Sequence, residues 1–400
     1  MSWFMFVLGL LVVVGTGASV LFTMVLPRRP SAVEVVGLAV NRSTRLVFIG
    51  VAKFARSYEA KDAVLALVGP VALVAQLLFW ALGFVVGFAL MLQPTTNNLA
   101  DGLLQALGSV FTVGAVHPGG VENEAIDVTA GAVWVVVVAL QIAYLPALYS
   151  AFSQREGLVA MLESRAGVPA WGPELLARHQ LVGIIDTLPE LYSEWEAWAA
   201  GVAESHTTYP VLLLFRSPEP WLSWLLALLA VLDGAAMHLA LSPDTASSNA
   251  RLCLRMGFTA LDRIGSTLGW DLDPDPMPES PIDLTFEDFE QAVQMLEEVG
   301  FPLERSAADA WPDFHGWRVN YESVAYQLCD RLVAPPAPWS GLRRQLTTNI
   351  AEPRRPPHRR PATTASAFSP RPVRRSLRPD DEPEQSEAAE PDRDSPPSDA

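Results

Sequence analysis

The residues of this chain that are best suited to chemistry lie in a short uncharged loop made of Thr112, Val113, Gly114, Ala115 and Val116. Before the loop, Asn98 can cap a helix of about three turns that has Asp101 in its first turn. Non-helical backbone at membrane depth survives only where it is buried or lines a watery cavity. A loop that turns its carbonyl oxygens toward an axis can replace the hydration shell of an ion. The pattern predicts a re-entrant loop with an ion-binding constriction.

Polar residues flank this loop and could form the mouth of a pore. They are Asp101, His117, Glu122 and Glu124, with Asp127 one turn further on. The acids would attract cations, and the alternative is that each is simply a solvated residue of an external loop. One loop cannot close a ring of carbonyls, and potassium filters use four. A conducting form would therefore be a homotetramer that passes a monovalent cation.

The other polar residues do not form a recognisable catalytic or metal site. The clustered candidates lack the H-E-x-x-H spacing that sets two imidazoles on one metal; they are His179, Asp186, Glu190, Glu204 and His206. Pro274 and Pro276 intervene among the alternating Asp271, Asp273 and Asp275, so we do not expect a calcium loop there. The two cysteines do not form a C-x-x-C pair. We therefore expect no enzyme, no metal and no cofactor.

The composition of the chain is that of a membrane protein. Of its 400 residues, 50% are hydrophobic and only 18% are charged. A net charge of −16 argues against nucleic acid as a partner. Residues 1–150 carry 7 basic and 7 acidic side chains, residues 151–333 carry 10 and 27, and residues 334–400 carry 11 and 10. The chain thus divides into an apolar third, an acidic middle and a polar tail.

Three uncharged runs are long enough to cross a hydrocarbon core of about 30 Å; they are 3–26, 63–92 and 128–152. The alternative for the first run is a cleaved signal peptide, which should open with basic residues, and none precedes Arg28. The second run can tilt, or kink near Gly69 and Pro70. We expect three transmembrane helices in a lipid bilayer, with the loop of 112–116 between the second and third.

The distribution of basic residues predicts the orientation. Segment 27–62 holds seven basic residues, and segment 93–127 holds none. Because basic loops remain cytoplasmic, we expect the N-terminus outside the plasma (cell inner) membrane and the chain after the third span inside. In the first loop, Thr44 to Tyr58 has the spacing of an amphipathic helix on an anionic membrane surface, and the alternative is a solvated connector.

A fourth apolar stretch, 221–241, has Asp233 near its middle. An acid at the centre of a spanning helix costs about 2.5–3.5 kcal/mol on an insertion scale. We therefore expect a buried helix of the cytoplasmic domain. If the stretch did span, Asp233 would be expected to line a pathway.

The unit of span, loop and span over 63–152 resembles the potassium-channel pore-loop superfamily, whose filter reads Thr-Val-Gly-Tyr-Gly. Thr112, Val113 and Gly114 match this pattern, whereas Ala115 and Val116 depart from it, and His117 replaces the Asp that commonly follows. The chain is also similar to a bacterial group of channel-like integral membrane proteins in three segments, 144–156, 194–199 and 204–212. The resemblance implies a cation channel, and the departures imply a less selective or a non-conducting pore.

The predicted fold is mainly α, with four parts. They are an N-terminal transmembrane helix and cytoplasmic linker (1–62), a two-helix pore-loop unit (63–152), an acidic helical cytoplasmic domain (153–333) and a disordered tail that is rich in Pro and Arg and then acidic (334–400). Inside the domain, Thr285 and Asp288 resemble a capping box. Two functions follow: a potassium-type cation channel with a degenerate filter, or a non-conducting, membrane-anchored helical scaffold or signalling protein.

Overall fold

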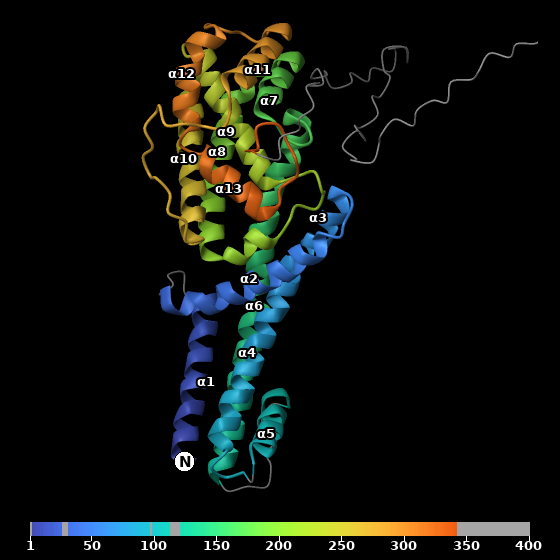
Figure 1. Ribbon diagram of the computed structural model, residues 1–400, viewed down its shortest axis with the longest axis vertical. Coiled ribbons are helices and arrows are strands. Elements are labelled where there is room, and N and C mark those ends of the chain that lie inside the picture. The colour runs from blue at the N-terminus through green and yellow to red at the C-terminus, as the bar shows by residue number, and fades with distance from the viewer. Residues whose placement is uncertain (1, 26–30, 97, 113–120, 342–400) are drawn as a thin grey trace, which may run out of the picture. The chain divides into compact units, whose positions relative to one another are not determined.

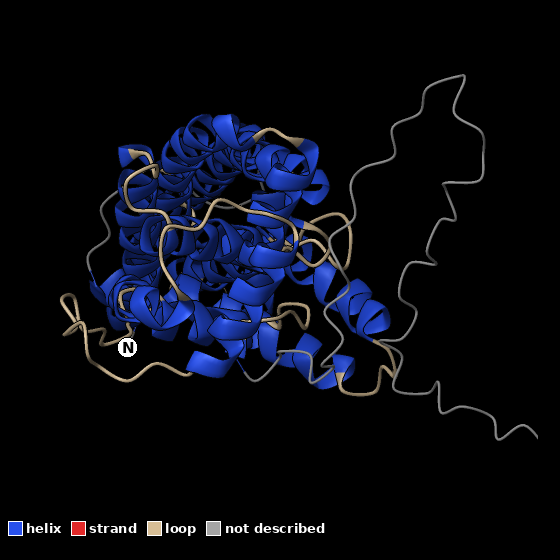
Figure 2. Ribbon diagram, turned by 90° about the horizontal axis from the view of Figure 1, so that it is seen from above, coloured by secondary structure: helices blue, strands red, loops and turns tan. Residues whose placement is uncertain are grey.

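The computed structural model describes residues 2–25, 31–96, 98–112 and 121–341. Within these ranges every regular element is a helix, and Figure 2 shows only helices and loops there. The prediction of a mainly helical protein is confirmed, with 77% of the described residues helical. Figure 1 gives the order of the elements and their labels.

Among the described residues, four helical segments are long and apolar enough to cross a membrane by length and composition. Three lie in the predicted runs: α1 (Ser2–Met24), α4 (Val68–Leu92) preceded by α3 (Tyr58–Ala66), and α6 (Val121–Ala166). These helices expose large apolar side chains, among them Leu11, Val74, Leu78, Val136 and Ile142. The fourth segment, α9 (Trp224–Leu241), differs because all its residues are buried. The exposed apolar surface of α1, α4 and α6 suits contact with lipid.

α1 packs closely along α4. A Cβ atom added at Gly9 would lie 2.5 Å from the Gly87 carbonyl oxygen, so only glycine permits this approach. Further along the same contact, the buried Trp80 Nε1 donates a hydrogen bond to Ser19 Oγ at 3.1 Å. Small residues allow close packing between helices in a membrane, where burial of apolar surface supplies little driving force. The N-terminal helix is thus a packed part of this unit.

The break between α3 and α4 falls at Leu67, close to the kink expected at Gly69 and Pro70. Pro70 has no N–H to donate to the carbonyl of Ala66, four residues earlier, and its ring crowds that carbonyl. The chain therefore ends one helix and begins another within the first turns of the second apolar run, 63–92.

The helix predicted at 44–58 begins and ends earlier in the chain than expected. α2 spans Ser31–Ala52 and lies crosswise between α1 and α3 in Figure 1, so residues 44–52 of the predicted segment are helical and residues 53–57 are not. Whether it lies on a membrane surface stays a prediction. After a short turn Ser57 caps the start of α3: its backbone is extended, and its Oγ accepts a hydrogen bond from Ala60 N at 3.2 Å.

α6 is much longer than the predicted third span of 128–152. It contains 46 residues, which corresponds to about 69 Å at 1.5 Å per residue. The predicted boundary between residues 152 and 153 therefore lies inside a continuous helix. α6 runs on until Gly167, whose φ of 81° ends it.

A helical domain surrounds α9, which contacts α6, α7, α8, α10, α12 and α13. Its other elements are α7 (Gly172–Val182), η1 (Ile185–Thr187), α8 (Leu188–Thr208), η2 (Pro210–Leu214), α10 (Ser248–Thr267), α11 (Phe286–Glu298), α12 (Ala307–Arg318) and α13 (Glu322–Leu332). The expected cap of α11 is confirmed, because Thr285 Oγ1 accepts from Asp288 N at 3.2 Å. α9 is thus the central helix of this domain.

The folded chain also continues past the predicted boundary at residue 333. Ala334, Ala337 and Trp339 are buried in the core of the helical domain. The ring of Trp339 lies 5.5 Å from that of Trp171 and 5.8 Å from that of Phe314. The prediction that the disordered tail begins at residue 334 is therefore wrong for residues 334–341. Burial of the Trp339 ring stabilises this segment in spite of its proline-rich composition. The rest of the predicted tail, 342–400, lies outside the described residues.

Candidate functional site

The short helix α5 (Leu99–Phe111) occurs between α4 and α6, where the sequence predicts it. The expected cap is confirmed: Asn98 Oδ1 accepts a hydrogen bond from Asp101 N at 2.9 Å. Gly102, Ala106 and Val110 are buried on one side of α5, and the helix packs against both α4 and α6. The opposite side exposes Leu104, Leu107 and Phe111. α5 therefore carries apolar side chains on both its buried and its exposed side, as suits an apolar environment.

A buried carboxylate joins α5 to α6. Asp127 has no exposed surface, and its two oxygens accept hydrogen bonds from Ser109 Oγ at 2.6 Å and from Gln105 Nε2 at 2.9 Å. The two donors are four residues apart and so lie on one face of α5. The prediction that Asp127 belongs to a cation-attracting mouth is wrong, because these donors hold it between the helices. We call these three residues the Asp127 clasp.

A second contact fixes the other end of the α4–α5 connection. Thr95 Oγ1 lies 2.7 Å from Asn123 Oδ1, to which it donates, and Asn123 is buried. The loop after α4 is thereby tied to the first turn of α6. Together with the clasp, this contact connects the whole segment from α4 to α5 with α6.

The predicted site residues divide into three groups. Asp101, Thr112 and Glu124 are exposed, and Thr112 is the residue that ends α5. Glu122 is in the first turn of α6, and its side chain is outside the described part. The remaining predicted residues also lie outside the described residues: Val113, Gly114, Ala115, Val116 and His117.

A buried arginine connects α6 to the helical domain. Arg155 is 2% exposed, and its Nε donates to Glu156 Oε1 at 2.7 Å. Its Nη1 donates to the Leu212 carbonyl at 3.1 Å and its Nη2 to the Phe215 carbonyl at 2.8 Å. The Arg155 carbonyl in turn accepts from Trp198 Nε1 at 2.9 Å. These bonds fasten the long helix to α8 and η2.

We call the contacts of Arg155 with Glu156, Trp198, Leu212 and Phe215 the Arg155 joint. His206 belongs to this joint and not to a metal site. Its Nε2 lies 3.1 Å from Arg155 Nη1, and a guanidinium can only donate, so Nε2 accepts and the ring is neutral. Burial and then the Arg155 charge hold the pKa of His206 well below its usual value. No group of His, Cys, Asp and Glu in the described part of the chain could hold a metal ion.

Asp233 forms a different buried network, which the sequence did not predict. Its carboxylate pairs with Arg318 and accepts a hydrogen bond from Tyr321 Oη at 2.8 Å. Arg318 also pairs with Glu322 and donates to Tyr326 Oη at 2.9 Å and to the Trp339 carbonyl at 3.0 Å. The available signal was the separation of Arg318 and Glu322 by four positions, at the end of α12 and the start of α13. Asp233 is thus compensated inside the domain core.

The three segments that resemble the bacterial channel-like group meet at the Arg155 joint. Arg155 belongs to the first, Trp198 to the second and His206 to the third, and the rings of Tyr144 and Tyr209 lie 5.5 Å apart. The membership of the chain in that group stays a prediction. Comparison of the chain with protein-family models, with curated proteins and with solved structures finds no match.

Proposed function

We propose that this chain is a channel-like integral membrane protein in which α4, α5 and α6 form the pore unit of a homotetramer. Residues 112–116 would form its constriction for a monovalent, potassium-type cation. The Asp127 clasp carries the proposal, because it fixes a short capped helix between two apolar helices. An acid buried in an apolar helix is costly, and such residues usually serve a function.

The proposed topology has three spans, α1, α4 and α6, with the N-terminus outside the plasma membrane. The basic residues of 27–62 would then lie on the cytoplasmic side. α9 would not span, because its neighbours are helices of its own domain and Asp233 pairs with Arg318 there. A reporter fused ahead of Met1 should be accessible only from outside, and access only from the cytoplasm would contradict this topology.

The helical domain would act on the pore unit through α6. This helix carries the Asp127 clasp near one end and Arg155 toward the other, without a break between them. A rotation of the domain would therefore move the helix against which α5 is held. In this proposal the domain gates or stabilises the tetramer.

A second candidate is a membrane-anchored helical scaffold or signalling protein that does not conduct. Val116 favours it, since a branched side chain resists the backbone conformation that the second filter glycine allows. Ala115 also lacks the aromatic ring that would brace the loop against its helix. In that case the helical domain would recruit partners, and the loop would serve only as a connection.

Ion flux into liposomes that contain the purified chain separates the two candidates. We expect potassium flux from the wild type, loss of flux for Gly114→Ala and greater potassium selectivity for Val116→Gly. Gly17→Ala is the matched control, because a Cβ added at Gly17 meets nothing within 4 Å. Silence of every form in a verified tetramer, Val116→Gly included, would favour the scaffold.

A further inference from the structure

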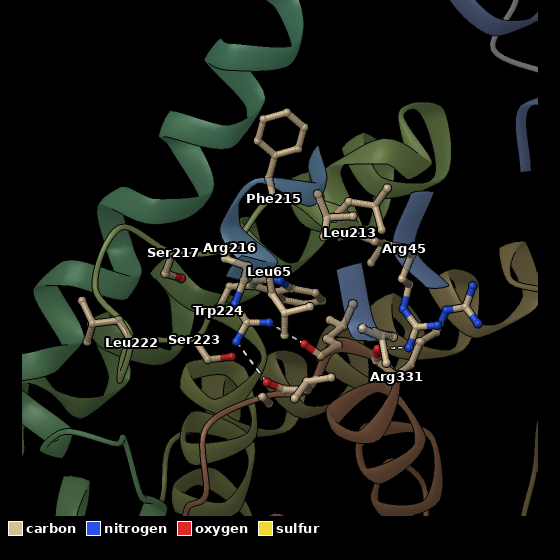
Figure 3. Close-up of a pocket in the computed structure, with 16 residues that line it drawn as sticks. Arg45, Leu65, Leu213, Phe215, Arg216, Ser217, Leu222, Ser223, Trp224 and Arg331 are labelled. Carbon is tan, nitrogen blue, oxygen red and sulfur yellow. Dashed lines mark hydrogen bonds between the residues drawn. The ribbon is translucent and has the colours of Figure 1, made fainter. Parts of the chain in front are cut away.

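A pocket lies where the helical domain meets α2 and the beginning of α4 (Figure 3). Its lining combines arginines with aliphatic side chains, including Arg45, Ile49, Leu65, Val68, Leu213 and Arg331. In Figure 3 the Arg45 and Arg331 side chains lie together at one side of the pocket, away from Arg216. We call it the α2–α13 pocket.

Arg216 is committed to the structure of the pocket. It pairs with Asp62, and it donates to Tyr58 Oη at 2.6 Å and to the carbonyls of Leu332 at 2.6 Å and Val333 at 3.0 Å. These bonds hold the end of α13 against α3. Arg216 therefore builds the pocket and is not the group that would bind a ligand.

Arg45 and Arg331 are placed differently. Arg45 donates to the carbonyl oxygen of Arg331, which brings the two residues together from α2 and α13. Burial and then the charge of Arg331 lower the pKa of Arg45, and burial and then the charge of Arg42 lower that of Arg331. Three partly buried or adjacent arginines thus repel one another. An anion among them would relieve this repulsion.

The surface beside the pocket is apolar. α2 exposes more than half of Leu46, Val47 and Val51, and Phe54 just after it is 88% exposed. α4, which begins in the pocket lining at Val68, continues with exposed apolar side chains. A cationic pocket that adjoins apolar helix surfaces suits an anion attached to hydrocarbon chains better than a small free anion.

We propose that Arg45 and Arg331, with Arg42 beside them, bind a phosphate group, and that the headgroup of an anionic phospholipid supplies it. The guanidinium fork matches phosphate oxygens in pairs. The lipid would join α2 to the end of α13 and so connect the helical domain to the membrane surface. The proposal rests on the membrane placement above but not on ion conduction, so silence in a flux assay leaves it intact.

The test measures binding of the purified full chain in detergent to short-chain phosphatidylglycerol, with phosphatidylcholine as the neutral lipid. We expect phosphatidylglycerol to raise the melting temperature and phosphatidylcholine to leave it unchanged. The double variant Arg45→Gln/Arg331→Gln should bind phosphatidylglycerol about twenty-five-fold more weakly, at about a factor of five for each arginine near an anionic surface. Lys53→Gln removes one exposed charge from the same region outside the pocket lining, and it should bind as the wild type does.

Two results would overturn the proposal. Equal binding by the wild type and the double variant would show that these arginines do not hold the headgroup. Equal stabilisation by glycerol phosphate in the absence of lipid would assign the pocket to a free phosphate ester.

Since a Gln at position 45 still carries a donor for the Arg331 carbonyl, the variant should fold. Arg45→Lys/Arg331→Lys, which keeps both charges, should recover part of the affinity and serves as the second variant.

Discussion

Asp127 and Asp233 are both buried acids in apolar helices, yet their surroundings differ. Asp233 pairs with Arg318, whose other bonds reach α13 and the Trp339 carbonyl. Asp127 accepts hydrogen bonds from the neutral groups of Ser109 and Gln105. The first is a charge network that holds a domain core, and the second is a clasp between two helices. The partner of a buried acid, more than its burial, therefore indicates its role.

The largest effect should follow from removal of Arg318. Arg318→Met leaves the carboxylates of Asp233 and Glu322 buried without their cation, which costs about 3–5 kcal/mol. Chemical unfolding of the full chain in detergent measures the change. Arg305→Gln is the control, because its pair with Asp313 is exposed and worth about 0.2–1 kcal/mol. Similar stability of the two variants would mean that the network does not hold the core.

Loss of the clasp should have a smaller effect. Asp127→Ala takes the acceptor from the half-buried Gln105 amide and leaves Ser109 Oγ to the Gln105 carbonyl at 2.9 Å, at a cost of about 1–3 kcal/mol. Asp127→Asn retains one acceptor and should lose less. Thermal unfolding in detergent, with the exposed neighbour Glu124→Ala as control, measures the difference. The account of the clasp fails if Asp127→Ala and Glu124→Ala unfold at the same temperature.

The Arg155 joint should depend on pH. Because the pKa of His206 is lowered in the folded chain, the unfolded state takes up the proton first as the pH falls through about 6.5. The stability due to neutral His206 is thus complete above that pH and is lost below it, by at most about 1.4 kcal/mol per pH unit. Between pH 8 and 5, the denaturant concentration at the unfolding midpoint should fall less steeply for His206→Gln than for the wild type. Parallel curves would rule out this assignment.

The two helix caps should give the smallest effects and separate the regions. Asn98→Ala and Thr285→Ala each remove a side-chain acceptor at a helix start, at about 1 kcal/mol. In the proposed channel only the α5 cap lies in the pore unit, so Asn98→Ala should reduce flux and Thr285→Ala should not. Reduced flux for Thr285→Ala alone would reverse this comparison.

The sequence predicted the features that depend on local residues. The apolar runs, the short helix α5 and the caps at Asn98 and Thr285 follow from composition and from contacts within four residues. The start of α2 and the length of α6 were missed, since no strong breaker marks residue 44 or residue 152. Local patterns locate helices better than they locate helix ends.

The pairings that make the candidate site could not be predicted. Arg155 and His206 are separated by 51 positions, and Arg318 and Asp233 by 85. Only the packing of α6, α8, α9 and α12 brings these side chains together. For the same reason Asp127 looked like a solvated acid until its donors on α5 were known.

The most direct measurement of the central claim is potassium flux into liposomes that hold equal amounts of tetrameric wild type and Asp127→Ala. We expect flux for the wild type and its loss for Asp127→Ala, while the helical domain keeps the unfolding midpoint of the wild type. Equal flux from both would contradict the role of the clasp. No flux from either, in verified tetramers, would contradict the channel itself.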